Sequence, residues 1–418
     1  MTFHTSRMPA VAFALAAALS VAPAVLAQQL PFEQVVSQLT SPDAGTRLSA
    51  LRLLRQSGYA EAALPIAPLL SDPDTRMQRE ALATELELFL GRGGVGRGAV
   101  RAFDSNWAAV PITPVPIEVV VGLLTPLKDR STAVRVEAAY AIGLLGQIDG
   151  VPADARYKPV VEALAARMGD PEPAVRLAAA RASGRVFRRC PGGCAVLAVD
   201  RVGDGLVRLL NDSETAVQGA AMEGLGEVRY ERAVTALADL FNYYKTGEMA
   251  YGALDTLARI GQPASIPMFR AALTSKDPNF RRAAVEGLAR TGDKDGAAAA
   301  EAIAAAERDP SVVLALAFGQ QRSARAQHTG RLLQALNDRT LRSQAQDYLV
   351  ELGTPVAPEV SGALSGAAPD VRVALLEVLG VIGTSEQLTA VDALHNDADA
   401  RVKAAAERVS SRIRGSKR

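Results

Sequence analysis

The sequence is poor in the side chains that most often form metal sites or carry out chemistry. It has two cysteines, three histidines and one tryptophan among 418 residues, and aromatic side chains make up 5% of the chain. His4, His328 and His395 lie far from one another and from Cys190 and Cys194. Zinc sites need such residues at short, regular spacings. We therefore expect no metal and no cofactor, and no residue is assigned a catalytic role.

The chain also lacks an excess of either charge. It has 46 basic and 45 acidic side chains, and removal of the first 27 residues would take away only Arg7. Nucleic-acid-binding proteins usually carry a clear basic excess. We therefore expect no nucleic-acid partner.

Only one segment approaches the length of a membrane span. Arg7 precedes a run rich in alanine, leucine and valine from 10 to 26, which contains Pro23 and ends at Ala27. This pattern is typical of a bacterial secretory signal peptide over residues 1–27. We expect cleavage after Ala27, export to the periplasm and no membrane span in the mature chain; retention as an anchor is the alternative.

The most regular feature is a repeated phrase with a period of about 31. Six anchor positions, at residues 250, 281, 312, 342, 372 and 403, fall 31, 31, 30, 30 and 31 residues apart. After the anchor Arg281 come Ala284, Val285 and Leu288, and then Gly292. Arg47, Arg135, Arg176 and Gln218 head similar phrases nearer the N-terminus. A fixed period of this length indicates stacked supersecondary units rather than one globular core.

The spacing within each phrase predicts a helix. Apolar residues three, four and seven positions after the anchor share one face of an α-helix, and the glycine eleven positions on is placed where helices often end in a left-handed residue. Aspartate caps helix starts, and proline is accepted at the first position. A second apolar stretch follows each glycine, so one repeat is helix, turn, helix, turn. The Asp-Pro pairs ahead of the anchors are Asp72-Pro73, Asp170-Pro171, Asp277-Pro278 and Asp309-Pro310.

The phrase from Asp170 to Ala180 resembles the HEAT-like repeats first described in phycobilisome lyases, and the resemblance covers nearly the whole mature chain. It implies an all-α, right-handed α-solenoid of ten or eleven stacked helical hairpins, with a period shorter than the roughly 40–47 residues of standard HEAT repeats. Such repeats occur in scaffolds, adaptors, chromophore lyases, a metal-dependent hydroxylase and DNA glycosylases. The resemblance therefore implies an architecture and leaves the function to individual residues.

The repeats are interrupted in two places. Glycine and proline are dense from Gly91 to Pro116, which predicts a long surface loop, and a second loop surrounds the two cysteines. In an oxidising compartment Cys190 and Cys194 would pair as a disulfide. The expected segments are 1–27 signal peptide, 28–90 repeats, 91–116 insertion loop, 117–189 repeats, 190–204 cysteine loop and 205–418 regular repeats with a polar C-terminal cap at Glu407, Ser410 and Arg414.

Aromatic residues supply the candidate partner-binding positions. Half of the eight tyrosines lie between 230 and 251, and the only tryptophan lies in the insertion. Tyrosine and tryptophan are frequent at binding hot spots, although each can equally belong to a core. The candidates are Trp107, Tyr243, Tyr244 and Tyr251, with Phe241 and Tyr244 expected to share a core-facing helix side.

Charged residues receive a structural interpretation. The anchor arginines would form a ladder along one edge, and each could bridge a helix-capping aspartate of its own or a neighbouring repeat. Glu85 and Glu87 are expected to be ordinary acids on a helix surface. The ladder consists of Arg135, Arg176, Arg281, Arg342 and Arg372, and its expected partners are Asp129, Asp170, Asp277, Asp338 and Asp370.

Together these features predict an exported, non-catalytic scaffold or adaptor that binds protein partners on its concave face. The alternative function is an enzyme or enzyme subunit of the HEAT-like lyase type. The oligomeric state and the identity of the partner are left open.

Overall fold

The computed structural model describes residues 31–90, 99, 103, 111, 115–146, 157–188, 200–324 and 328–415. Within these residues the chain forms eleven pairs of helices and no β-strand. The all-α solenoid predicted from the repeats is thereby confirmed. Trp107, Cys190, Cys194 and the predicted signal peptide 1–27 lie outside the described residues. None of the described helices is both long and apolar enough to cross a membrane.

The anchor residues begin one row of long helices, called here the anchor row. These helices are α2 (Ala44–Ser57), α4 (Thr75–Leu90), α7 (Thr132–Leu145), α9 (Pro173–Val186), α11 (Thr215–Val228), α13 (Gly247–Ile260), α15 (Pro278–Thr291), α17 (Pro310–Ala324), α19 (Arg342–Leu352), α21 (Pro369–Ile382) and α23 (Ala400–Gly415).

The second row is shorter and is often extended by one turn of 3-10 helix. Its α-helices are α1 (Phe32–Gln38), α3 (Ala63–Ile66), α6 (Ile117–Gly122), α8 (Lys158–Arg167), α10 (Asp200–Leu209), α12 (Val234–Tyr244), α14 (Ile266–Ala272), α16 (Lys294–Ala304), α18 (Thr329–Ala335), α20 (Ala357–Gly362) and α22 (Leu388–Asp392).

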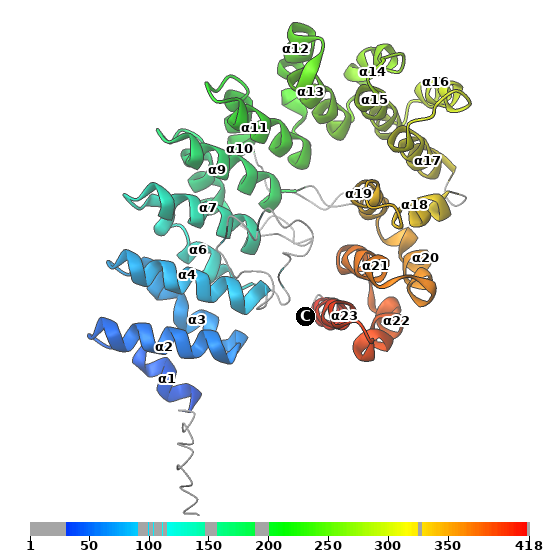
Figure 1. Cartoon of the computed structure of the whole chain (residues 1–418). Coiled ribbons are helices and arrows are strands. Elements are labelled where there is room, and N and C mark those ends of the chain that lie inside the picture. Colours follow the sequence, from blue (N-terminus) through cyan, green and yellow to red (C-terminus); the bar gives the residue numbers. More distant parts are fainter. Residues whose placement is uncertain are drawn as a thin grey trace, which may run out of the picture.

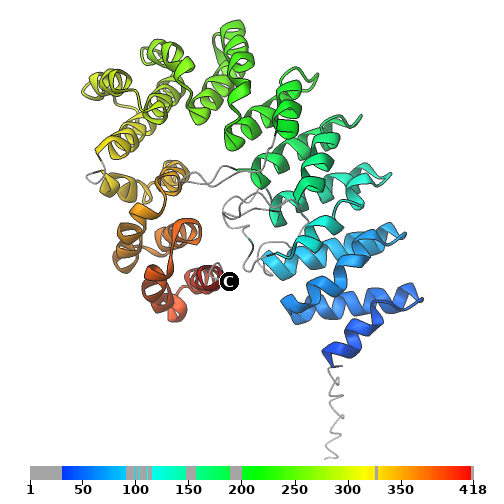
Figure 2. The same ribbon diagram turned by 180° about the vertical axis from the view of Figure 1, so that it is seen from behind.

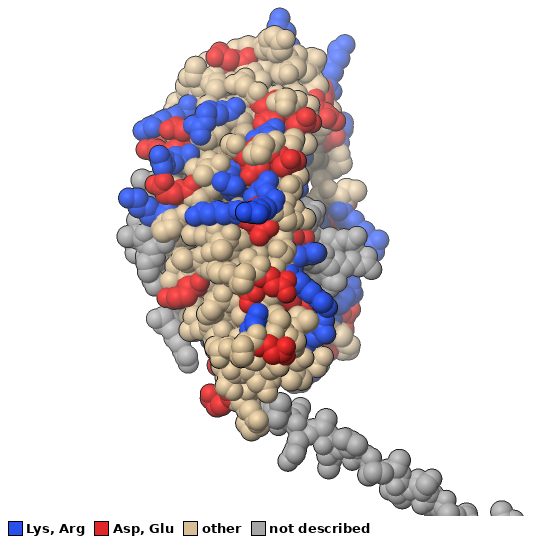
Figure 3. Space-filling model, turned by 90° about the vertical axis from the view of Figure 1, so that its left-hand side faces the viewer, with Lys and Arg blue, Asp and Glu red and all other residues tan. Residues whose placement is uncertain are grey.

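The stack bends into an arc with the anchor row on the inside. From α13 to α23, Figure 1 shows the anchor helices towards the centre and α12, α14, α16, α18, α20 and α22 on the outside, and Figure 2 shows the same order from behind. Seen from the side in Figure 3, basic and acidic side chains are intermixed, with no broad area of one sign on that face.

Small residues allow the anchor helices to pack closely. At Gly184 on α9, a Cβ atom would lie 2.9 Å from the Cα of Gly224 on α11. Core positions of these helices are occupied by fully buried alanine, such as Ala138, Ala179 and Ala221. This explains the alanine-rich, aromatic-poor composition, because closely packed helices leave little room between them for aromatic rings.

The predicted helix ends are correct only in part. Gly58 and Gly292 have positive φ and end their helices as expected, whereas Gly146 and Gly383 have negative φ. Asp277 caps α15 and is followed by proline at the first helical position, as predicted. Asp43 likewise caps α2, but before five other anchor helices the aspartate lies two residues ahead of the capping residue and accepts a hydrogen bond from that residue's N–H. Examples of this turn are Asp72 to Asp74, Asp129 to Ser131, Asp170 to Glu172 and Asp212 to Glu214.

The two predicted loops also differ in detail from the structure. Residues 200–204, assigned to the cysteine loop, form the first half of α10, because Val202 faces the core and is fully buried. Ala99 and Phe103, assigned to the insertion loop, have helical backbone conformation.

The anchor arginines connect consecutive repeats. Arg135 donates to both carboxylate oxygens of Asp170 in the next repeat, at 3.0 and 2.9 Å, and also to the carbonyl of Asp129 in the turn before its own helix. Arg176 makes the equivalent pair with Asp212, at 2.7 and 2.8 Å. Each such guanidinium thus links its own turn to the turn of the following repeat.

Towards the C-terminus, the anchor arginines have different kinds of partner. Arg281 pairs with Glu307 rather than Asp277, and hydrogen bonds from this arginine lower the pKa of Glu307 to about 2. Arg372 pairs with Asp397. Arg342 donates to the carbonyl of Leu336. The expected partners Asp277, Asp338 and Asp370 instead accept from Asn279, Thr340 and Arg401.

Two polar residues are buried where the sequence predicted exposure. Glu85 is completely inaccessible and both its carboxylate oxygens lack a hydrogen-bond partner, so it is not the surface acid that was expected. Its neighbour Glu87 is largely buried as well, but it pairs with Arg55. Glu85 occupies the position seven residues after Gln78, where six of the other ten repeats place leucine. Ser410, predicted to belong to the polar end cap, is also buried and donates to Asp392, whereas Glu407 is exposed.

Replacement of Arg135 by alanine should destabilise the chain strongly. The side chain is 9% exposed and that of Asp170 is 2% exposed, and removal of one member of a buried ion pair costs about 3–5 kcal/mol. Urea unfolding followed by circular dichroism measures the change. Arg401→Ala removes an exposed arginine that also pairs with an aspartate and should have little effect. Equal losses in the two variants would contradict the role given to the ladder.

Glu85 should make stability fall as the pH rises. Burial raises the pKa of Glu85 well above its ordinary 4.5, so the folded chain holds the proton more tightly than the unfolded chain. The carboxyl therefore costs nothing at low pH and destabilises increasingly as the pH rises above about 4.5. Glu85→Gln should remove this dependence, and Glu85→Leu should add about 1–3 kcal/mol at neutral pH. Urea titrations over a pH series check this, with exposed Glu118→Gln as control.

Candidate partner-binding surface

Side chains five and nine residues after each anchor form a stripe on the inside of the arc. We call this set the concave stripe. On most helices from α9 to α19 it is charged, whereas the core positions beside it are apolar. Its members on five of these helices are Arg181, Arg185, Glu223, Glu227, Asp255, Arg259, Glu286, Arg290, Asp347 and Glu351.

The arc curls tightly enough for helices far apart in sequence to face one another. A cavity of about 350 Å³ lies between α11, α13, α15 and α19, and its wall is mainly polar. The ionisable groups of the wall include five arginines and five acids, which balance in formal charge. They are Arg188, Arg229, Arg259, Arg282, Arg290, Glu227, Asp255, Glu286, Asp347 and Glu351.

Glu351 of α19 forms ion pairs with three other parts of the arc. Its carboxylate lies 2.9 Å from Arg290 of α15, 3.1 Å from Arg229 after α11, and 3.3 Å from Arg322 of α17. Burial by itself would raise the pKa of Glu351, but the positive charges, Arg290 foremost, lower it to about 2. The carboxylate is therefore charged at all physiological pH values.

A buried hydrogen bond and a ring stack support the same junction. The Tyr348 hydroxyl donates to Glu286 at 2.5 Å, and Glu286 also accepts from Arg290 at 3.0 Å. The Tyr348 ring stacks on Phe318 of α17 with centroids 4.3 Å apart. Burial and the carboxylate of Glu286 raise the pKa of Tyr348 well above its ordinary value, so it remains a donor.

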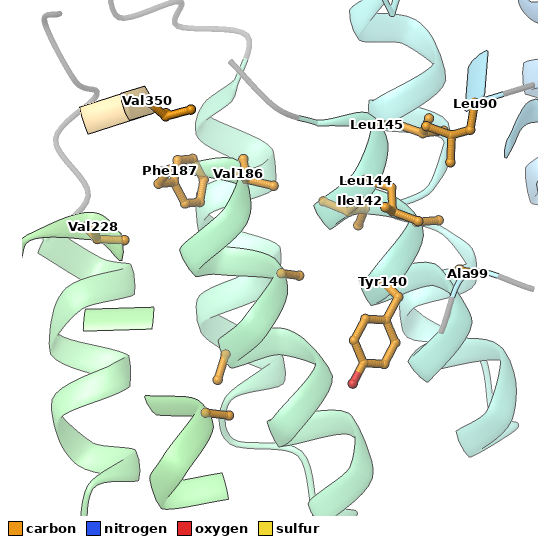
Figure 4. Close-up of a cluster of buried hydrophobic side chains, with 14 of the residues drawn as sticks. Leu90, Ala99, Tyr140, Ile142, Leu144, Leu145, Val186, Phe187, Val228 and Val350 are labelled. Atoms are coloured by element: carbon orange, nitrogen blue, oxygen red, sulfur yellow. The ribbon is translucent and has the colours of Figure 1, made fainter. Parts of the chain in front are cut away.

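Apolar contact closes the junction on one side. Figure 4 shows Val350 of α19 beside Phe187 and Val228, which lie at the ends of α9 and α11, and all three are buried. Because the Arg229 and Glu351 ion pair lies next to Val228 and Val350 in sequence, the ribbons are in contact at this point.

Glu227 is shared between two neighbouring repeats. It accepts from Arg188 beyond α9 and from Arg259 of α13 at 3.1 Å, and Arg259 also binds Asp255 at 2.9 Å. Burial raises the pKa of Glu227, but the charges of these arginines outweigh it and lower the pKa overall. Most acids of the cavity are thus neutralised within the chain.

Asp347 is the exception among the acids of the cavity wall. Its carboxylate makes no hydrogen bond or ion pair with other described residues, and its side chain is open to solvent inside the cavity although protein atoms surround it. This crowding raises the pKa of Asp347 to about 6, against the opposing influence of Arg259 and Arg188. The charge of Asp347 therefore changes around pH 6.

The predicted aromatic candidates are divided between two places. Tyr243 and Tyr244 lie at the end of α12, 80% and 40% exposed, with their rings 5.0 Å apart edge to face. Tyr244 is therefore not a core residue, whereas Phe241 packs near Phe280. Tyr251 is half-buried on α13, where its hydroxyl accepts from Arg282. The structure does not bring the three tyrosines into one patch.

A second cavity of about 400 Å³ lies on α2 and α4. It is lined by Arg52, Arg55, Gln56, Glu80 and Glu87. Arg55 pairs with both glutamates, while Arg52 is exposed and makes no hydrogen bond or ion pair with described residues. This part of the concave stripe is open.

The concave stripe was not predicted from the sequence. Its signal is present, because ionisable residues recur five and nine positions after the anchors from Arg181 to Glu351. Charged residues between apolar helix positions are normally assigned to solvent, and the sequence contains no indication that the arc brings them together.

Comparison with known proteins agrees with the repeat architecture. Residues 245–319 match the family described as HEAT repeats. This segment of the chain is therefore similar to HEAT repeats. No curated protein matches the sequence. The crystal structure of an engineered protein is 18% identical, with 92% of this chain and 98% of the other covered and a TM-score of 0.38. At that score the likeness carries no weight for shape or function.

Replacement of Glu351 by glutamine should open the curl. Three arginines would lose their shared counter-charge, which should cost about 3–5 kcal/mol and enlarge the radius of gyration measured by small-angle X-ray scattering. Because the pKa of Glu351 is lowered, the wild-type contribution is present above about pH 4.5 and is lost as the pH falls towards 2. Glu359→Gln, on the exposed side of α20, is the matched control. An unchanged radius and stability would contradict this role of Glu351.

Proposed function

We propose that the chain is an exported, non-catalytic scaffold that binds a protein partner through its concave stripe in the periplasm. The observation that carries this proposal is a contrast within the chain. The core position three residues after the anchor is alanine in ten of the eleven repeats, whereas the position five residues after the anchor varies in size and charge. From α2 to α23 that position holds Arg52, Ala83, Tyr140, Arg181, Glu223, Asp255, Glu286, Ala317, Asp347, Glu377 and Arg408.

Variation of this kind suits recognition better than folding. A position that only had to face solvent would tolerate similar polar residues throughout, while a surface complementary to one partner needs a different side chain at each step. A solenoid also presents a long continuous surface, which fits an extended or convex protein partner.

The open part of the stripe is the first contact surface we propose. From α11 to α19 most stripe charges are satisfied across the cavity, whereas the cavity on α2 and α4 keeps the unpaired Arg52. The exposed pair Tyr243 and Tyr244 offers a second, apolar contact outside the stripe. Export rests on the signal-like residues 1–27.

Crosslinking and affinity capture from the native periplasmic fraction test the proposal. The tagged wild type should capture a specific partner, and Arg52→Glu should recover at least about tenfold less, because a complementary contact becomes a repulsive one. Arg331→Glu, exposed on the outer helix α18, is the charge-matched control and should retain the partner. The triple variant Trp107→Ala, Tyr243→Ala, Tyr244→Ala tests the aromatic candidates separately.

Three outcomes would count against the proposal. Retention of the partner by Arg52→Glu and loss in Arg331→Glu would place binding on the outer row. Failure of the wild type to capture any partner would contradict a scaffold, and absence of the protein from the periplasmic fraction would contradict export.

A further inference from the structure

The concave stripe on α7 differs from that of its neighbours because it is apolar and already covered. Its two members are Tyr140 and Leu144, which are 3% and 0% exposed. Phe103 and Ala99 lie against this region, although they come from the segment that interrupts the repeats between 91 and 116. A part of the chain outside the repeats thus occupies the inner surface.

The Phe103 ring is contacted from two sides. It meets the Tyr140 ring edge to face, with centroids 4.9 Å apart and an angle of 61° between the planes. The guanidinium carbon of Arg185 on α9 lies 4.8 Å from the Phe103 ring centroid, within cation–π range. The tyrosine ring and the guanidinium group together form a slot for a flat aromatic side chain.

The backbone of the same segment is also recognised. Arg185 donates to the carbonyl oxygen of Phe103 at 3.2 Å, and Glu137 accepts from the N–H of Ala99 at 2.8 Å. Backbone contacts do not depend on side chains of the bound segment, whereas the slot selects the ring. This combination is how grooves bind short peptides, with main-chain hydrogen bonds for affinity and a pocket for one side chain.

Gly143 provides the space for the ring. A Cβ atom at this position would lie 2.7 Å from Cε2 of Phe103, closer than real contacts, and 3.0 Å from the Cα of Ala182. The slot exists because two helices pack over glycine at this level. The packing of α7 on α9 through Ala138, Ala179 and their neighbours does not require Phe103.

We propose that Glu137, Tyr140, Gly143 and Arg185 form a binding site for a short peptide that carries a phenylalanine or similar aromatic side chain, and that Phe103 occupies it as an internal ligand. The proposal rests on the scaffold function above and specifies a partner chemistry for one part of the concave face. A tethered ligand has an effective concentration on the order of millimolar, so a free peptide must compete with Phe103.

The chain itself supplies the probe. The peptide of residues 97–105, which contains Ala99 and Phe103, should bind the full-length Phe103→Ala variant at least tenfold more tightly than it binds the wild type, measured by fluorescence anisotropy. The same peptide with alanine in place of Phe103 should not bind. In the Phe103→Ala background, the additional change Arg185→Leu should abolish binding, because it removes both the cation over the ring and the donor to the carbonyl.

Several results would overturn the proposal. Equal binding to the wild type and Phe103→Ala would show that Phe103 does not occupy the site, and equal binding of the alanine peptide would show that the ring is not recognised. Circular dichroism must show folded variants; Phe103→Leu, which keeps an apolar side chain but loses the ring, replaces Phe103→Ala if that variant unfolds. Absence of peptide binding while Arg52→Glu still loses the captured partner would refute this site alone and leave the scaffold function standing.

Discussion

The arrangement of this solenoid depends on how one repeat is fixed against the next. Burial of the alanine- and leucine-rich helix faces supplies most of the stability, but the hydrophobic effect is not directional and leaves neighbouring helices some freedom of alignment. The guanidinium of Arg135 or Arg176 removes this freedom, because it must satisfy a carbonyl of its own turn and an aspartate of the next turn at the same time. Where it is present, the arginine ladder therefore helps to fix the register and adds to the stability that burial of the core supplies.

Once the register is fixed, the residues on the inner side are brought into contact by the curvature of the arc. Glu351 and Arg229 are 122 positions apart in sequence, and in a straight stack they would not meet. In the arc they lie 3.1 Å apart, and residues of distant repeats form ion pairs around the cavity between α11 and α19. The ion pairs do not create the curvature alone, since Val350 and Phe318 also pack at the junction.

The sequence predicts the parts of the structure that repeat, but it does not predict contacts that occur in a single repeat. The period and the helical spacing predict both helix rows, because the same pattern of apolar positions recurs along the chain. The anchor arginines could be placed on one edge for the same reason. The partner of Arg281 is Glu307, which has no counterpart elsewhere, and the position of Glu85 could not be predicted because glutamate is rarely buried without a partner. The curl is likewise a property of accumulated small rotations, for which no local pattern exists.

The use of the concave stripe by the chain itself limits where a partner can bind. Between α11 and α19 the arginines Arg259 and Arg290 already have carboxylate partners, so a charged ligand there must break existing pairs and gains little. On α7 and α9, a ligand has to replace the contacts of Ala99 and Phe103. On α2 and α4 it meets Arg52, which has no ion-pair partner among the described residues. Under the proposed scaffold function, binding should therefore begin in the N-terminal half of the arc, and the C-terminal half should act mainly to hold the curved shape.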